Sequence, residues 1–122
     1  MTFEQEWARC APWIESALAH AGGTHRPGDV KAMIQRGEAD FWPGRRSAAV
    51  TLVEDEPCER RLLIWLAGGD LAELGGPMLK RMETRGREAG CRRALIVGRP
   101  GWERALKPQG YAPLARLIAK DL

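Results

Sequence analysis

The sequence predicts a single α/β domain over residues 1–122, in which a mixed, mostly antiparallel sheet is flanked by helices. Two runs of mainly apolar residues, Arg61–Ala67 and Arg93–Val97, are typical of strands buried on both faces. The segment between them has apolar residues at helical spacing, so it predicts a right-handed crossover helix joining two parallel strands. A further run, Ser47–Val53, is rich in small and β-branched residues and predicts a hairpin with Arg61–Ala67.

The N-terminal part of the chain predicts two helices. Thr2 and Gln5 fit a capping box, in which each side chain bonds the backbone of the other residue. Apolar residues then recur at helical spacing, namely Phe3, Trp7, Cys10, Ile14 and Leu18. Pro12 either kinks this helix or begins a second one. A shorter helix is expected after Asp29, its predicted N-cap, and it should end at Gly37.

Glycine and proline indicate where the remaining elements begin and end. The pair Phe41–Trp42 predicts a short strand before a Pro-Gly turn. The crossover helix is expected to begin after Asp70 and to restart at Pro77, because proline suits the first turn of a helix. Trp102–Lys107 predicts one or two helical turns. Tyr111–Ala119 is predicted as the last strand, and the proline near its start makes it an edge strand.

Charge and composition limit the function classes. The 122 residues include 19 basic and 16 acidic ones, which gives a net charge of only +3 and predicts a mixed surface. Arginine pairs at residues 45–46, 60–61 and 92–93 are scattered along the sequence and have no aromatic residues interleaved, which disfavours nucleic-acid binding. The longest apolar stretch, Leu62–Ala67, is far too short to span a membrane.

Cysteine usage and the N-terminus indicate an intracellular setting. The 3 cysteines are widely spaced and form neither a CxxC pair nor a Cys/His ligand pattern, so we expect reduced thiols and no metal site. The first residues contain Glu4 and Glu6 instead of the basic and apolar stretch of a signal peptide. The sequence therefore predicts a cytoplasmic protein.

In the C-terminal half, a helix ending in Ala89-Gly90 is followed by a strand, a short helix and the pair Gly110-Tyr111. This half, residues 61–122, resembles the GNAT (Gcn5-related N-acetyltransferase) superfamily, in which a Gly-Phe pair precedes the last strand. The N-terminal half matches that family in element order. The stretches WLAGGDL, GCRRALIVGRPGW and QGY also resemble small GNAT-like proteins encoded by tailed phages and prophages.

The resemblance implies binding of acetyl-CoA along the end of the central strand and the start of the crossover helix. The residues that it assigns to the cofactor are Leu66, Ala67, Gly68, Gly69, Gly75, Gly76 and Arg99. A backbone N–H near Leu66 or Ala67 would polarise the thioester carbonyl. In the family a glycine-rich turn, Q/R-x-x-G-x-G/A, holds the pyrophosphate. That pattern is degenerate here, since no Arg or Gln precedes it and the carboxylates of Asp70 and Glu73 lie within it.

The family's general acid is missing. Many GNAT enzymes have a tyrosine four residues before the Gly of Gly-Phe, and Leu106 stands there in this sequence. Tyr111 is expected to pack in the core, and Trp102 either anchors the short helix or offers a stacking platform. His20 and His25 are expected to be surface or capping residues. Arg99, in a Gly-Arg-Pro-Gly loop, either contacts a ligand or bonds local groups.

Two functions stay open from the sequence. One is an acyl-CoA-dependent N-acetyltransferase with a degenerate cofactor motif. The other is a non-catalytic GNAT-like phage virion or assembly component, with protein partners or self-association through the edge-like last strand. The space between the strands ending at Ala67 and Val97 distinguishes them. If those strands splay apart the enzyme is favoured, and if side chains fill the gap it is not.

Overall fold

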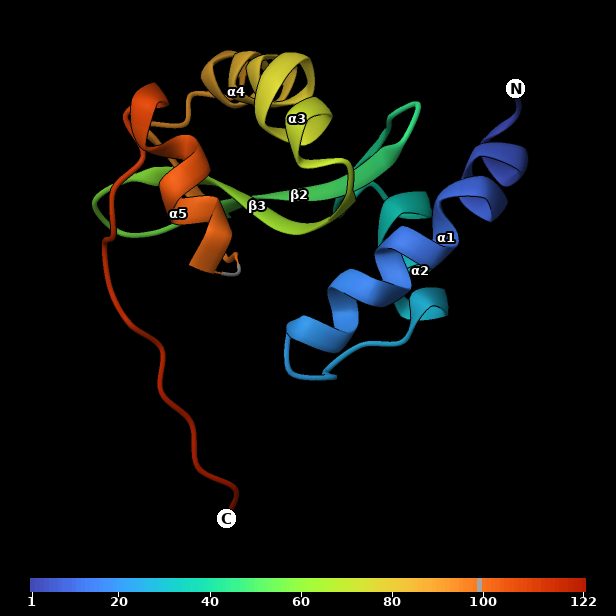
Figure 1. Ribbon diagram of the computed structural model, residues 1–122, viewed down its shortest axis with the longest axis horizontal. Helices are drawn as coiled ribbons and strands as arrows, with labels where there is room; N and C mark the ends of the chain where they lie inside the picture. Colours follow the sequence, from blue (N-terminus) through green and yellow to red (C-terminus); the bar gives the residue numbers. More distant parts are fainter. Residues whose placement is uncertain (99) are drawn as a thin grey trace.

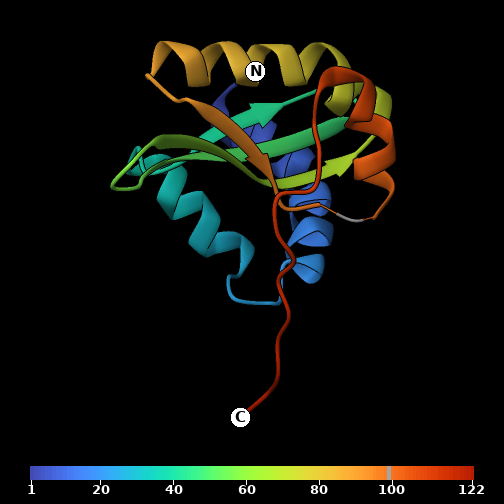
Figure 2. The ribbon, with the colours of Figure 1, turned by 90° about the vertical axis from the view of Figure 1, so that its left-hand side faces the viewer.

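The computed structural model describes residues 1–98 and 100–122, which place a four-stranded sheet between two layers of helices (Figures 1 and 2). Its strands follow the chain in the order β1-β2-β3-β4. They are β1 (Asp40–Pro43), β2 (Ser47–Asp55), β3 (Arg60–Gly69) and β4 (Arg93–Ile96). β1, β2 and β3 are antiparallel neighbours, whereas β3 and β4 are parallel. This confirms the predicted mixed, mostly antiparallel α/β sheet and its crossover connection.

One face of the sheet is covered by α1 (Phe3–His20) and α2 (Pro27–Gln35). The predicted apolar stripe of α1 is buried against the sheet, with Trp7, Cys10, Ile14 and Leu18 in the core. Pro12 lies inside this single helix, so the alternative of a second helix beginning there is wrong. The carbonyl that loses its donor belongs to Ala8, which is exposed and can be hydrated instead.

The second helix begins earlier than predicted. α2 starts at Pro27, and Arg26 precedes it as the N-cap. Asp29 is not the N-cap; its carboxylate accepts the Arg26 backbone N–H at 2.8 Å from within the first turn. A carboxylate in the first turn complements the positive end of the helix dipole. An aspartate can therefore stabilise the start of a helix from inside the first turn as well as from the N-cap.

The opposite face carries the crossover and the C-terminal helices (Figure 2). They are α3 (Leu71–Glu73), a π-helical turn η1 (Leu74–Met78), α4 (Leu79–Glu88), α5 (Pro100–Leu106) and a 3₁₀ turn η2 (Lys107–Gln109). The predicted interruption is a kink at Gly76, whose φ of −110° and ψ of −111° lie outside the helical region. Within the described residues, none of the helices combines the length and apolar character needed to cross a membrane.

A β-bulge in β3 changes which side chains face each layer. Val50 and Thr51 are consecutive on β2 but lie opposite Leu66 and Ile64, so Trp65 is an extra residue on β3. Before the bulge, Ile64 packs against the α3–α4 layer, whereas after it Leu66 packs against α1. Because one residue is inserted, the side chains after the bulge face the opposite helical layer from the one that regular alternation would give them.

The predicted last strand, Tyr111–Ala119, is absent from the structure. Residues 111–122 form an extended segment without secondary structure, and it leaves the body of the protein (Figures 1 and 2). The last backbone hydrogen bond among the described residues near this segment joins the Tyr111 N–H to the Leu106 carbonyl at 3.4 Å. The apolar composition of the segment predicted a strand, but composition does not supply the neighbouring strand that a ladder requires.

Candidate functional site

A cleft opens where β3 and β4 separate. Their parallel pairing runs from Arg61–Arg93 to Ile64–Ile96 and stops there, while β3 continues to Gly69. The bulge at Trp65 lies directly after the last pair, and bulges bend a strand and end regular pairing. The resulting cleft has a volume of about 270 Å³, and its lining residues include Trp65, Ala67 and Gly98.

The walls of the cleft come from three parts of the chain. Trp65 and Ala67 of β3 form one side, and Trp102 of α5 lies on the other. His20, the last residue of α1, reaches the cleft from the helical layer. Trp102 packs against the core, as the anchoring role predicts, and it also lines the cleft, where stacking on a ligand stays a prediction.

His20 is exposed and bonds a carbonyl of its own helix, as predicted for a surface or capping residue, and it also lines the cleft, whereas His25 contacts the cleft residue Trp65. The Nδ1 atom of His20 is 3.0 Å from the Ser16 carbonyl oxygen, which can only accept a hydrogen bond. Nδ1 is therefore the nitrogen that donates to this oxygen, and Nε2 takes no part in this bond. The ring of His25 stacks edge-on against Trp65, with centroids 4.8 Å apart. Their neighbourhood depends on how the α1–α2 connection turns back over β3, which local sequence does not reveal.

The residues assigned to the cofactor separate into two groups. Ala67 lines the cleft, and the backbone of Leu66 lies beside it, although the Leu66 side chain is buried under α1. Gly68 and Gly69 serve close packing. A Cβ at Gly68 would collide with the Trp13 carbonyl oxygen. Gly69 has a φ of +105° and lies against the Arg46 backbone. Arg99, which was also assigned to the cofactor, lies outside the described residues.

Comparison with known proteins supports this architecture. No protein-family model matches the sequence, and no curated protein matches it either. Solved structures do match. A crystal structure of a Trypanosoma brucei acetyltransferase superposes with a TM-score of 0.61 and 12% identity, over 89% of this chain and 92% of that one. The fold is GNAT-like.

Two further structures agree with the GNAT-like assignment. The protein TTHA1254 from Thermus thermophilus has a TM-score of 0.67 and 16% identity, over 99% of this chain and 93% of its own. A protein described as a "probable acetyltransferase" has a TM-score of 0.65 and 13% identity, over 100% of this chain and 93% of its own. At these identities the likeness establishes the fold.

The connection between β3 and α3 is the place where the resemblance predicts pyrophosphate binding. Only Asp70 separates β3 from α3, and its carboxylate accepts the Ala72 N–H at 3.0 Å. The same carboxylate is 3.1 Å from the Arg46 guanidinium. Gly75 packs against the Leu106 side chain, whereas a Cβ at Gly76 would meet open space.

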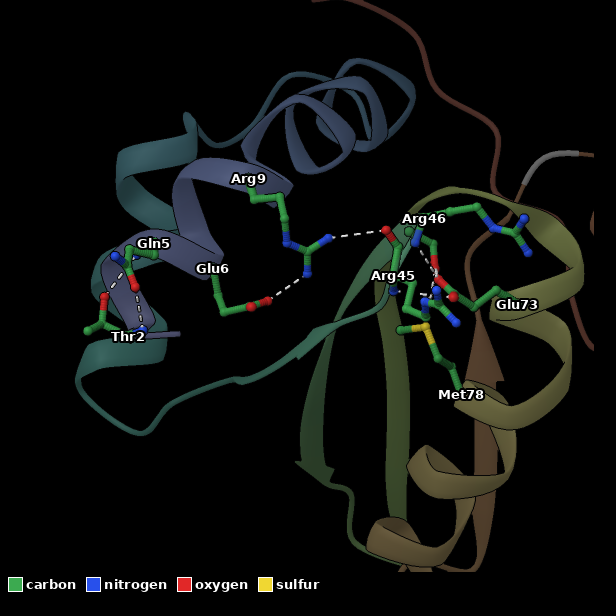
Figure 3. Close-up of polar contacts among 9 residues, drawn as sticks. Thr2, Gln5, Glu6, Arg9, Arg45, Arg46, Glu73 and Met78 are labelled. Carbon is green, nitrogen blue, oxygen red and sulfur yellow. Dashed lines mark hydrogen bonds and ion pairs between the residues drawn. The ribbon is translucent and has the colours of Figure 1, made fainter.

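The Glu73 side chain points toward Arg45 and Arg46, in the turn between β1 and β2 (Figure 3). Its carboxylate accepts the backbone N–H groups of Arg45 and Arg46 at 3.2 and 3.0 Å, and also the hydroxyl of Ser47. The Ser47 hydroxyl and then these two N–H groups hold the pKa of Glu73 below its usual value. Glu73 thus fixes the β1–β2 turn to the crossover helix.

The acid groups of GNAT enzymes have no counterpart at the cleft in the described residues. Leu106, at the position of the family's tyrosine, is buried in the core. Tyr111 packs against that core as predicted, and its hydroxyl donates to Glu83 at 2.7 Å. Burial, followed by the bond to Glu83, raises the pKa of Tyr111. Because Tyr111 lines a different cavity, beside β4, it is not the acid of this cleft.

Proposed function

We propose that this protein is an N-acyltransferase that takes an acyl thioester such as acetyl-CoA into the β3–β4 cleft. The separation of the two strands at the Trp65 bulge is the observation that supports it. Beyond Ile64 the backbone of β3 has no β4 partner in the described part of the chain. An unpaired N–H at Leu66 or Ala67 can therefore donate to a thioester carbonyl and stabilise the charge that develops there.

The cleft also supplies a base. In a neutral imidazole that donates from Nδ1 to the Ser16 carbonyl, Nε2 of His20 can remove a proton from an attacking amine, and the Nδ1 bond fixes the ring. Trp65 and Trp102 provide apolar walls that exclude water from the reacting groups. Acetyl-CoA supplies the activated acyl group, and these residues orient it and accept the proton.

The donor is recognised chiefly through its thioester end. The cleft volume of about 270 Å³ suits the acyl group and the adjoining part of the pantetheine arm. The turn that would bind pyrophosphate is filled by Asp70 and by the close packing of Gly68 and Gly69. We therefore expect S-acetylpantetheine, which lacks the phosphates, to serve as a donor with kcat/KM within about tenfold of acetyl-CoA.

Binding and turnover test this proposal. Acetyl-CoA at about 100 times its dissociation constant should stabilise the fold by roughly 2.7 kcal/mol, which raises Tm by about 10 °C. Release of free thiol with a panel of primary amines then measures turnover. Ala67→Leu fills the cleft and should abolish both signals. Ala8→Leu adds the same side chain on the exposed face of α1 and should change neither.

The role of His20 is tested separately. His20→Gln should lower kcat by about 10²-fold or more, with the thermal shift by acetyl-CoA retained. If acetyl-CoA raises the Tm of Ala67→Leu as much as that of the wild type, the cleft is not the binding site. Absence of any shift by either thioester would contradict the enzymatic function itself.

A further inference from the structure

The β3–β4 cleft takes its lining residues from both helical layers. Three of them pack with the core cluster beside α1, namely Ala17, Ala21 and Trp65. Two others pack with the cluster beside α4, namely Ala67 and Trp102. The cleft therefore has one end in each layer. Under the proposed function the thioester lies at the Ala67 end, which leaves the end beside α1 for the amine.

The end beside α1 is aromatic and has no negative charge in the part of the chain that the structure describes. His20, the last residue of α1, is the only ionisable side chain among the described lining residues. The ring of His25 lies edge-on against Trp65, with centroids 4.8 Å apart. An imidazole is either neutral or positive, so neither histidine can compensate an ammonium ion. Because an unpaired charge is costly to remove from water, this end favours an amine that is uncharged when it binds.

The size of the cleft limits the acceptor to about one ring. The cleft volume is about 270 Å³, and a cavity of about 150 Å³ is enough to hold benzene. The remaining volume suits the acyl group and the thioester. Trp65 is partly exposed, and its indole ring offers a flat apolar surface on which a second ring can stack.

We propose that the acceptor is a small aromatic amine, with its amino group attached directly to the ring, and that it stacks on Trp65. Such an amine is almost entirely unprotonated at neutral pH, because its lone pair is delocalised into the ring. Its nitrogen attacks the thioester carbonyl carbon, and the carbon–sulfur bond then breaks to release the thiolate. The proton that the nitrogen loses passes to Nε2 of His20 and from there to the thiolate, which yields an anilide and a free thiol. This inference rests on the proposed function.

Two isomeric amines test the acceptor class. Para-toluidine and benzylamine contain the same atoms, but at neutral pH only benzylamine is mostly protonated. With acetyl-CoA as donor and release of free thiol as the readout, kcat/KM for para-toluidine should be at least about tenfold higher. An equal or higher value for benzylamine overturns the proposal.

A carboxylate introduced into the cleft should shift the selectivity. Ala21 lines the end beside α1, whereas Ala19 is exposed and is not a lining residue. Ala21→Asp should lower KM for benzylamine relative to that for para-toluidine by at least about tenfold, because the carboxylate compensates the ammonium ion. Ala19→Asp adds the same charge two residues earlier and should leave the ratio of the two KM values within about threefold. Equal effects of the two substitutions contradict the assigned acceptor end.

The contact with Trp65 has its own test, which also separates this inference from the proposed function. Trp65→Leu should raise KM for para-toluidine by about tenfold and change KM for acetyl-CoA by less than about threefold. A rise confined to KM for acetyl-CoA would show that Trp65 contacts the donor instead. If no amine releases thiol and acetyl-CoA does not shift Tm, the proposed function fails and this inference with it. Thiol release that favours benzylamine, with a normal shift in Tm, contradicts the acceptor class alone.

Discussion

Glu73 is the residue whose loss should most directly separate the β1–β2 turn from the crossover helix. Its carboxylate accepts two backbone N–H groups, from Arg45 and Arg46, and one hydroxyl, from Ser47 (Figure 3). Glu73→Ala removes all three acceptor contacts. Glu73→Gln keeps the shape of the side chain but removes the charge and one of the two acceptor oxygens.

The expected cost follows from the partners. Hydrogen bonds to a charged group contribute about 1.5–3 kcal/mol each when the partners are buried. Arg45 and Arg46 are exposed, so water replaces the carboxylate at their N–H groups and only a part of that energy is lost. Ser47 is fully buried, and its hydroxyl also lies 3.2 Å from the Met78 sulfur. We expect Glu73→Ala to lower the free energy of unfolding by about 2 kcal/mol and Glu73→Gln by about 1 kcal/mol.

The lowered pKa of Glu73 also determines how its contribution to stability changes with pH. The folded state lowers the pKa of Glu73 from its ordinary value of 4.5, so the carboxylate stabilises the fold fully above that pH. As the pH falls from 4.5 through the lower pKa of the folded state, Glu73 becomes protonated and this stabilisation is lost. Urea denaturation should therefore show a constant difference between wild type and Glu73→Gln at pH 6–8. A difference that grows on acidification, or none at neutral pH, would refute the assignment.

Two further substitutions test packing and burial. Gly68→Ala should destabilise the protein by about 2 kcal/mol in urea denaturation, because its Cβ would meet the Trp13 carbonyl oxygen, whereas Gly28→Ala, with open space around it, should not destabilise it. Tyr111→Phe should cost about 1 kcal/mol through loss of the bond to Glu83. The fold favours the protonated phenol of Tyr111, which raises its pKa, so ultraviolet titration should show its ionisation only well above pH 10. The free energy of unfolding should fall as the pH rises through that range.

The sheet was predictable because its central strands have strong local signals. Arg61–Ala67 and Arg93–Val97 are short apolar runs joined by a segment of helical spacing, and a right-handed crossover leaves few ways to arrange them. The hairpin with Ser47–Val53 followed from β-branched residues on both sides of a turn. Their pairing in the structure confirms this part of the prediction.

The cleft was only partly predictable. Ala67 and the adjoining backbone were identified from the family pattern, and the structure places them at the separation of β3 and β4. His20 and His25 were predicted as surface or capping residues, and their places beside the cleft and against Trp65 were missed because these depend on the path of the α1–α2 connection. The glycines at 68 and 69 signalled a close backbone approach, but the sequence does not say whether a phosphate or another segment makes that approach.

The bulge at Trp65 shows why the cleft and the core cannot be varied independently. A continuous apolar run conceals the bulge, since every residue from Leu62 to Ala67 suits either face of a doubly covered sheet. Once Trp65 is inserted, Leu66 must pack under α1 and Ala67 must face the α4 side, where the cleft lies. The same reversal turns Gly68 toward Trp13, where only a glycine fits. The opening between the strands is therefore fixed by the packing that holds α1 on the sheet, and a change that removes the bulge would close the cleft and misplace the core together.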